Sequence, residues 1–166
     1  MMRRPLIAIA LAALVIAAPA CGGSAAARDG SKADRILVLK GERRLELLRA
    51  GETLRSYPVR LGRNPVGPKI FQYDGRTPEG VYVIDRRTRR TQFHLALHIS
   101  YPQADNIARA AQYRIPPGGS IFIHGTPGTG SRFERDWTDG CIAVSNRAIE
   151  EIWKLVDVGT PIEIRP

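Results

Sequence analysis

Residues 120–146 read SIFIHGTPGTGSRFERDWTDGCIAVSN, and the rest of the chain can be interpreted outward from this stretch. A short apolar run of strand type ends at His124 and Gly125, a glycine-rich loop follows, and the Gly140-Cys141 pair opens a second apolar run. Such a loop can fold back, so we expect the Cys141 thiol to lie beside the His124 imidazole. A neighbouring imidazolium stabilises a thiolate and can lower a cysteine pKa to roughly 3.5–7.5, which favours Cys141 as a nucleophile and His124 as its base.

The residues around this pair support further expectations. Gly140 suits a turn whose backbone N–H groups could form an oxyanion hole for a substrate carbonyl. A structural interpretation stays open, because a cysteine is also commonly a small buried apolar residue. The flanking Asp136 and Asp139 favour turn or capping roles, and His98 in LHISYP favours a structural role near the site.

The chain offers few residues for a metal or a cofactor. It contains three histidines and two cysteines, and the cysteines form no CxxC pair. No glycine-rich phosphate loop is present. We therefore expect no metal site and no cofactor.

Apolar residues alternate with polar ones along most of the chain, which predicts a mainly β fold. In YPVRLG, for example, Tyr57, Val59 and Leu61 would face the core. The stretches expected to form strands are residues 35–40, 43–49, 57–62, 80–84, 93–99, 120–125 and 161–165. The cluster RRTRR at 86–90 is interpreted as a solvated turn between two of them.

Two stretches follow helical spacing instead. Apolar residues recur at i, i+3, i+4 and i+7 within 104–111 and again within 149–156. Asn146 is expected to cap the second helix, and Gly159 lies beyond its end. The sequence thus predicts a mainly β domain with two short helices.

The N-terminal residues have the character of an export signal. A basic start, an apolar run and Ala18-Pro19-Ala20 fit a cleavable signal peptide at 1–20. Residues 21–34 would form a flexible leader and 35–166 a single domain. Cys21 is either acylated, which would anchor the chain to a membrane, or left as an unmodified thiol.

The formal net charge of +9 predicts attraction to acidic surfaces. Nucleic acid is disfavoured as a partner, because no basic helix and no aromatic residues interleaved with arginine are found. An anionic polymer of the cell envelope or a membrane surface fits export better. We expect a periplasmic or envelope location.

Four motifs resemble the YkuD-type (ErfK/YbiS) L,D-transpeptidases of bacterial cell walls. They are IFIHGT at 121–126, TDGCIAV at 138–144, GRTPEGVYVI at 75–84 and LHISYP at 97–102. The resemblance spans roughly residues 35–165 and implies a β-sandwich-like catalytic domain with two short helices. It also implies that Cys141 is the nucleophile and His124 the general base and acid.

The resemblance further implies a substrate, the stem tetrapeptide of peptidoglycan. The thiolate would attack the carbonyl of the L-centred diamino acid, expel D-alanine and leave a thioester. An amine would then take the acyl group to form a cross-link, or water would take it. The residues expected on the substrate side are Gly125, Thr126, Thr138, Asp139, His98 and Arg135.

Two positions depart from the family pattern. Ala143 stands where many members have arginine, and Asp139 where many have histidine; Ala143 resembles a YafK-like branch. Arg132, Arg135 and Arg147 are candidates for the missing positive charge. Three functions stay open: a cross-linking transpeptidase, a thiol hydrolase of stem-peptide or lipoprotein linkages, and an inactive peptidoglycan-binding protein.

Overall fold

The computed structural model describes residues 32–127 and 135–166, and within them it is mainly β with two helices, as predicted. The expected signal peptide, Cys21 and Arg132 lie outside the described residues. The strands are β1 (Arg35–Leu39), β2 (Arg44–Arg49), β3 (Glu52–Pro58), β4 (Gly80–Thr91), β5 (His94–Ile99), β6 (Phe122–His124), β7 (Ile142–Ala143) and β8 (Pro161–Arg165). The helices are α1 (Ala104–Ala111) and α2 (Asn146–Leu155).

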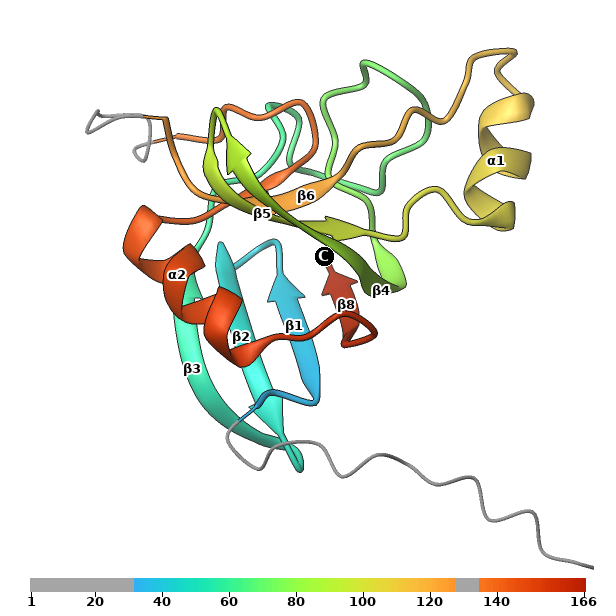
Figure 1. Ribbon diagram of the computed structural model, residues 1–166. Helices are drawn as coiled ribbons and strands as arrows, with labels where there is room; N and C mark the ends of the chain where they lie inside the picture. The colour runs from blue at the N-terminus through green and yellow to red at the C-terminus, as the bar shows by residue number, and fades with distance from the viewer. Residues whose placement is uncertain (1–31, 128–134) are drawn as a thin grey trace, which may run out of the picture.

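The strands form one sheet in the order β3-β2-β1-β8-β4-β5-β6-β7. The long strand β4 joins its two halves, since residues 80–83 pair with β8 and residues 84–91 pair with β5. In Figure 1 the second half, β4 to β6, crosses above the half that contains β1, β2 and β8. This arrangement encloses a core between two sheet layers, which agrees with the expected sandwich-like architecture.

The core follows from the period-two pattern, because each strand buries alternate residues. Tyr57, Val59 and Leu61 are all buried, as predicted, although β3 ends at Pro58 and the backbone beyond it makes only isolated bridges. Both halves of the sheet and helix α2 contribute to one cluster. Its fully buried members include Ile36, Val38, Leu45, Leu47, Ile84, Leu97, Ile99, Ile123, Ile142, Ile149, Ile152 and Ile162.

Helix α2 packs against β5 and β6, and α1 lies on the other side of the molecule (Figure 1). The N-cap of α2 is Ser145, whose hydroxyl accepts from the Ala148 N–H, so the expected cap at Asn146 is wrong. Ser145 has the extended backbone of a cap residue, whereas Asn146 is already helical. The Asn146 side chain instead accepts from the Thr126 N–H at 2.8 Å and ties the helix to the end of β6.

The prediction of a turn at residues 86–90 is also wrong, because β4 runs through this cluster to Thr91. Register shifts at Ile84/Arg86 and Thr88/Thr91 allow the strand to bend. The guanidinium of Arg87 lies 4.0 Å from the centroid of the Trp153 ring, so an aromatic face supports part of the arginine run. A strand can therefore carry consecutive arginines here.

Residues 32–34 of the expected leader already pack on the domain. The N–H of Ala33 donates to the Leu155 carbonyl at 2.8 Å, and Ala33 is buried. Among the residues that the structure describes, neither helix has the length and apolar character needed to cross a bilayer.

Candidate active site

The sheet register gathers the candidate residues on one face. Thr88 pairs with Ala96 and Ala96 with His124, while β7 runs parallel to β6 with Ile142 beside Ile123. Residue 141 therefore comes level with Phe122, two residues before His124 and on the same face of the sheet. Both side chains line a pocket of about 270 Å³. The pocket is lined by Thr88, Thr91, Gln92, Phe93, Ala96, Ser120, Phe122, His124 and Cys141.

The surroundings of His124 favour a neutral imidazole. Its Nδ1 lies 2.6 Å from the Gly125 carbonyl, an acceptor that fixes the proton on Nδ1 and leaves Nε2 with a lone pair. The ring stacks on Phe93 at a centroid distance of 4.5 Å, and Trp137 meets it edge-on at 5.7 Å. Burial among these rings lowers the pKa of His124, although the bond to Gly125 opposes the shift.

Cys141 is held as a thiol. Its Sγ lies 3.6 Å from the Ser120 carbonyl, to which the thiol donates. Burial raises its pKa to about 11, opposed by a hydrogen bond from the Phe122 backbone. The expected lowering of this pKa is therefore not found, because burial of the thiol outweighs the groups that favour the thiolate. The geometry suits a neutral pair in which the proton moves as the sulfur attacks.

The turn before Cys141 is closed by one hydroxyl. Thr138 Oγ1 donates to the Cys141 carbonyl at 2.8 Å and accepts from the Gly140 N–H at 3.1 Å. Gly140 has φ +131, and a Cβ there would lie 2.6 Å from the Arg76 carbonyl. Only glycine suits this conformation and this close approach.

The loop of residues 135–141 is also tied to the rest of the domain. Asp136 accepts from the Leu61 N–H at 2.9 Å and pairs with Arg43 at 2.8 Å. Asp139 pairs with Arg63 at the surface. Both carboxylates thus help to hold the loop in place, as the predicted structural roles imply.

The comparisons with known proteins identify this arrangement. The model of the YkuD family, described as the L,D-transpeptidase catalytic domain, matches residues 33–164. The chain belongs to the YkuD family. YafK of Escherichia coli strain K12 is 32% identical over 128 residues, which cover 73% of this chain and 46% of YafK.

Solved structures agree with the fold of this YkuD domain. Pgp2 of Campylobacter jejuni, described as a helical cell shape determining protein, aligns with a TM-score of 0.63 at 25% identity, over 79% of this chain and 46% of Pgp2. An L,D-transpeptidase from Mycobacterium smegmatis aligns with a TM-score of 0.55 at 17% identity, over 80% and 58%, and shows the fold alone. The chain thus spans about half the length of the relatives it matches.

The other residues expected on the substrate side are placed in different surroundings. Gly125 is buried against the Asn146 side chain, and Thr126 follows it. His98 donates from Nδ1 to Asp85 at 2.6 Å and meets the Phe122 ring edge-on at a centroid distance of 4.8 Å. It therefore does not line the Cys141 pocket itself but packs against Phe122, which does. Arg135 is exposed at the start of the loop.

Arg147 is exposed on α2, where it pairs with Glu151. Ala143, where the family often has arginine, is fully buried. Its N–H and carbonyl exchange two 2.8 Å bonds with the backbone of Arg60. Position 143 is thus buried and its backbone is paired with Arg60, and its methyl side chain offers no charge to a substrate.

Several residues around the site were missed by sequence reasoning. Phe93 and Trp137 enclose His124, and Arg76 lies against Gly140. The aromatic residues carry no signal of their own, because only the fold brings them to His124. Arg76 stands in the quoted motif GRTPEGVYVI and could have been singled out there.

Proposed function

We propose that this YkuD domain acts as an L,D-transpeptidase on the stem tetrapeptides of peptidoglycan, with Cys141 as nucleophile and His124 as general base. The observation that carries the proposal is the shared pocket, in which a thiol and a neutral imidazole face the same space. The hydrogen bond from His124 Nδ1 to Gly125 supports the assignment, because it leaves Nε2 to accept a proton.

In the first half-reaction, Nε2 of His124 takes the thiol proton as Sγ of Cys141 attacks the carbonyl of the L-centred diamino acid. The tetrahedral intermediate collapses, the C–N bond to D-alanine breaks, and the imidazolium returns the proton to the leaving amine. A thioester remains on Cys141. An amine of a second stem peptide then attacks the thioester and His124 takes the proton of that amine. As the C–S bond breaks, the imidazolium returns the proton to the sulfur, which releases the cross-linked peptide and restores the Cys141 thiol.

The oxyanion of this intermediate needs a backbone donor. The Gly140 N–H already donates to Thr138 at 3.1 Å, so we assign the oxyanion to the N–H of Cys141 itself, which follows in the same turn. Gly140 contributes by letting the turn approach Arg76 closely. Removing an oxyanion donor typically lowers kcat by about 10²–10³.

Peptidoglycan places this activity in the cell envelope. The expected signal peptide at 1–20 fits export, and an acylated Cys21 would hold the domain at a membrane. The proposed polymer is anionic, and the net charge of +9 complements it.

A single experiment tests the proposal. The full chain, as wild type and Cys141→Ala, is incubated with disaccharide-tetrapeptides and with lipoprotein-linked peptidoglycan, and the products are followed by mass spectrometry. Cross-linked dimers, a D-alanine product and an acyl-enzyme mass are expected with wild type only. His124→Gln should lower the rate by about 10²–10⁴ through loss of the base.

Other outcomes would select other functions. Release of the lipoprotein, or of D-alanine without a new bond, would establish a hydrolase with the same thiol chemistry. Wall binding that Cys141→Ala leaves unchanged, without any acyl-enzyme, would establish a non-catalytic binding protein. Either result contradicts the transpeptidase.

A further inference from the structure

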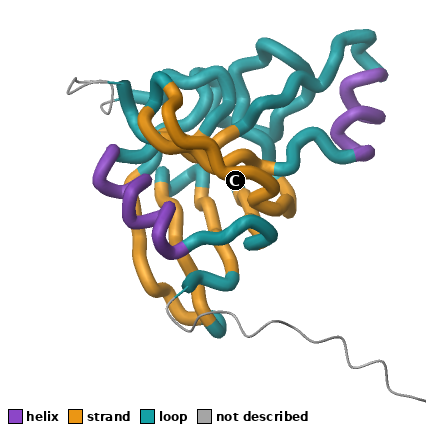
Figure 2. Tube along the Cα trace, in the orientation of Figure 1, coloured by secondary structure: helices purple, strands orange, loops and turns teal. Residues whose placement is uncertain are grey.

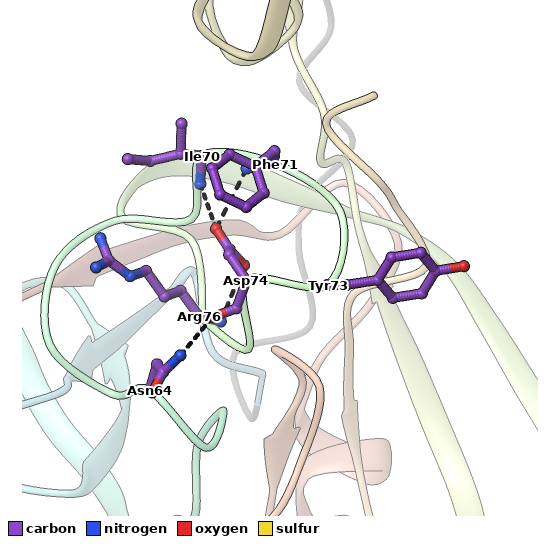
Figure 3. A pocket seen from close by; sticks show the side chains of 6 residues that line it. All are labelled: Asn64, Ile70, Phe71, Tyr73, Asp74 and Arg76. Carbon is purple, nitrogen blue, oxygen red and sulfur yellow. Dashed lines mark hydrogen bonds between the residues drawn. The ribbon is translucent and has the colours of Figure 1, made fainter. Parts of the chain in front are cut away.

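A second pocket, of about 250 Å³, opens in the loop of residues 62–79 (Figure 3). It shares no lining residue with the Cys141 pocket. It is lined by Asn64, Ile70, Phe71, Tyr73, Asp74 and Arg76. Its two ionisable groups of opposite charge, Asp74 and Arg76, have different surroundings, and this difference gives the pocket its chemistry.

The negative charge of Asp74 is already balanced by neighbouring groups of the loop. Lys69 Nζ lies 2.8 Å from Oδ1, the Arg76 N–H donates to the same oxygen at 3.0 Å, and the Ile70 N–H donates to Oδ2 at 2.7 Å. Burial opposes ionisation, but these hydrogen bonds outweigh it and lower the pKa of Asp74. The carboxylate is therefore charged, and its charge is matched by Lys69.

The Arg76 guanidinium, by contrast, has no such partners among the described residues. Within residues 32–127 and 135–166 it makes no ion pair and no hydrogen bond, whereas Arg63 of the same loop pairs with Asp139. A Cβ at Gly67 would lie 3.2 Å from Arg76 Nη1, so the glycine leaves space for the guanidinium. The pocket thus presents one cation whose donors can take a ligand.

The backbone of Arg76 also lies against the turn that carries Cys141. Its carbonyl lies 2.6 Å from the position of a Cβ on Gly140, so Arg76 and Cys141 are carried by two segments in direct contact. Ala143 is buried and supplies no charge on the other side of the turn. A peptide that is bound at Cys141 and extends past the Gly140 turn would reach the loop that carries the Arg76 guanidinium.

We propose that the Arg76 pocket binds a free carboxylate of the peptide whose carbonyl Cys141 attacks, and so selects acidic over amidated stem peptides. This inference rests on the proposed function. A guanidinium accepts a carboxylate through two parallel N–H bonds, a geometry that lysine cannot reproduce. The carboxylate is either the terminal one or a side-chain one of the stem peptide.

The first test compares steady-state kinetics of wild type, Arg76→Gln and Arg76→Lys. Arg49→Gln is the matched control, because it removes one exposed arginine charge at the end of β2, away from this loop (Figure 1). We expect Arg76→Gln to raise KM about tenfold or more, as loss of a hydrogen bond to a charged group does, with a smaller change in kcat. Arg76→Lys should fall between, and Arg49→Gln should match wild type.

Peptides amidated at the terminal or at the side-chain carboxylate identify the group. Wild type should lose about tenfold in kcat/KM on one of the two amides, and Arg76→Gln should no longer distinguish that amide from the acid. Equal discrimination by wild type and Arg76→Gln would overturn the proposal. So would an equal rise of KM in Arg49→Gln.

A binding measurement separates this inference from the proposed function. The affinity of the acidic and amidated peptides for Cys141→Ala is measured with and without Arg76→Gln, without any turnover. A preference for the acid that Arg76→Gln removes supports the Arg76 pocket even if no transpeptidase product is found. No preference in Cys141→Ala overturns it even if the domain proves to be a transpeptidase.

Discussion

The turn at Cys141 separates two regions that are held together by different forces. On one side, strands β4 to β6 carry an apolar pocket that is lined by Phe93 and Phe122 together with His124 and Cys141. On the other side, the loop of residues 62–79 lies among the loop segments at the top of Figure 2 and is fastened by the ion pairs Lys40–Glu79 and Lys69–Asp74.

This difference suggests that the two sides of the turn have separate roles in chemistry and in recognition. The apolar side keeps imidazole and thiol uncharged, because burial disfavours both of their ionised forms. The loop side concentrates charge and leaves Arg76 available to a ligand. Chemistry that needs a neutral base and recognition that needs a cation are thereby kept on opposite sides of one turn.

The largest expected effect comes from breaking the loop side. In Lys69→Met the Asp74 carboxylate would stay buried without its partner, since the two side chains are only 3% and 6% exposed. We expect a loss of about 3–5 kcal/mol in the free energy of unfolding, measured by urea denaturation at neutral pH. Lys32→Met is the control: its pair with Asp157 is more exposed, so the loss should stay within about 1 kcal/mol.

The same variant carries a pH test. Because the folded state lowers the pKa of Asp74, the stability contributed by its ionised form is present at neutral pH and is lost as the pH falls through that folded pKa. The stabilities of wild type and Lys69→Met should therefore converge in acid. A difference that is independent of pH would mean that the ion pair is not its cause.

These two regions also differ in how far they could be predicted. The alternation of apolar and polar residues correctly predicted that Tyr57, Val59 and Leu61 are buried. A strand with one buried face shows this period of two in its sequence. No such period exists in residues 62–79, whose conformation depends on hydrogen bonds from two buried lysines. A lysine in a polar stretch gives no sign that the fold will bury it.

Short elements were predicted poorly for a related reason, because their conformation depends on the rest of the fold. Strand β7 has two residues and depends on its pairing with β6, so the sequence pattern does not distinguish it from the turn before it. The cap of α2 was misplaced by one residue, because Ser145 and Asn146 are both good cap residues and the Thr126 N–H competes for Asn146. At the candidate site, the sequence anticipated that His124 and Cys141 come together, but not the aromatic rings that leave them uncharged.

A smaller effect is expected on the apolar side, in the pH dependence of kcat/KM. Protonated His124 cannot act as a base, so activity should fall in acid, and the lowered pKa places the midpoint below the ordinary value of 6.5. Phe93→Ala would let water reach the ring and should move that midpoint upward toward 6.5. Phe71→Ala, an aromatic truncation in the Arg76 pocket, should leave it in place.

The complementary measurement is alkylation of Cys141 by iodoacetamide. A thiol with a pKa of about 11 contains little thiolate at pH 8, so the rate should be lower than for an ordinary cysteine and should climb as the pH rises toward 11. A fast reaction that is independent of pH between 6 and 8 would instead indicate a thiolate–imidazolium pair, and the neutral mechanism would be wrong.

The smallest expected effect concerns the exposed ion pair beside the turn. Asp139 and Arg63 are 75% and 67% exposed, so water screens their attraction and Asp139→Asn should change the free energy of unfolding by less than about 1 kcal/mol. Because Asp139 also contributes to the raised pKa of Cys141, though less than burial does, the variant should alkylate slightly faster at pH 8. A stability loss as large as that of Lys69→Met would show that exposed charges, and not the buried lysines alone, hold the loop against the Cys141 turn.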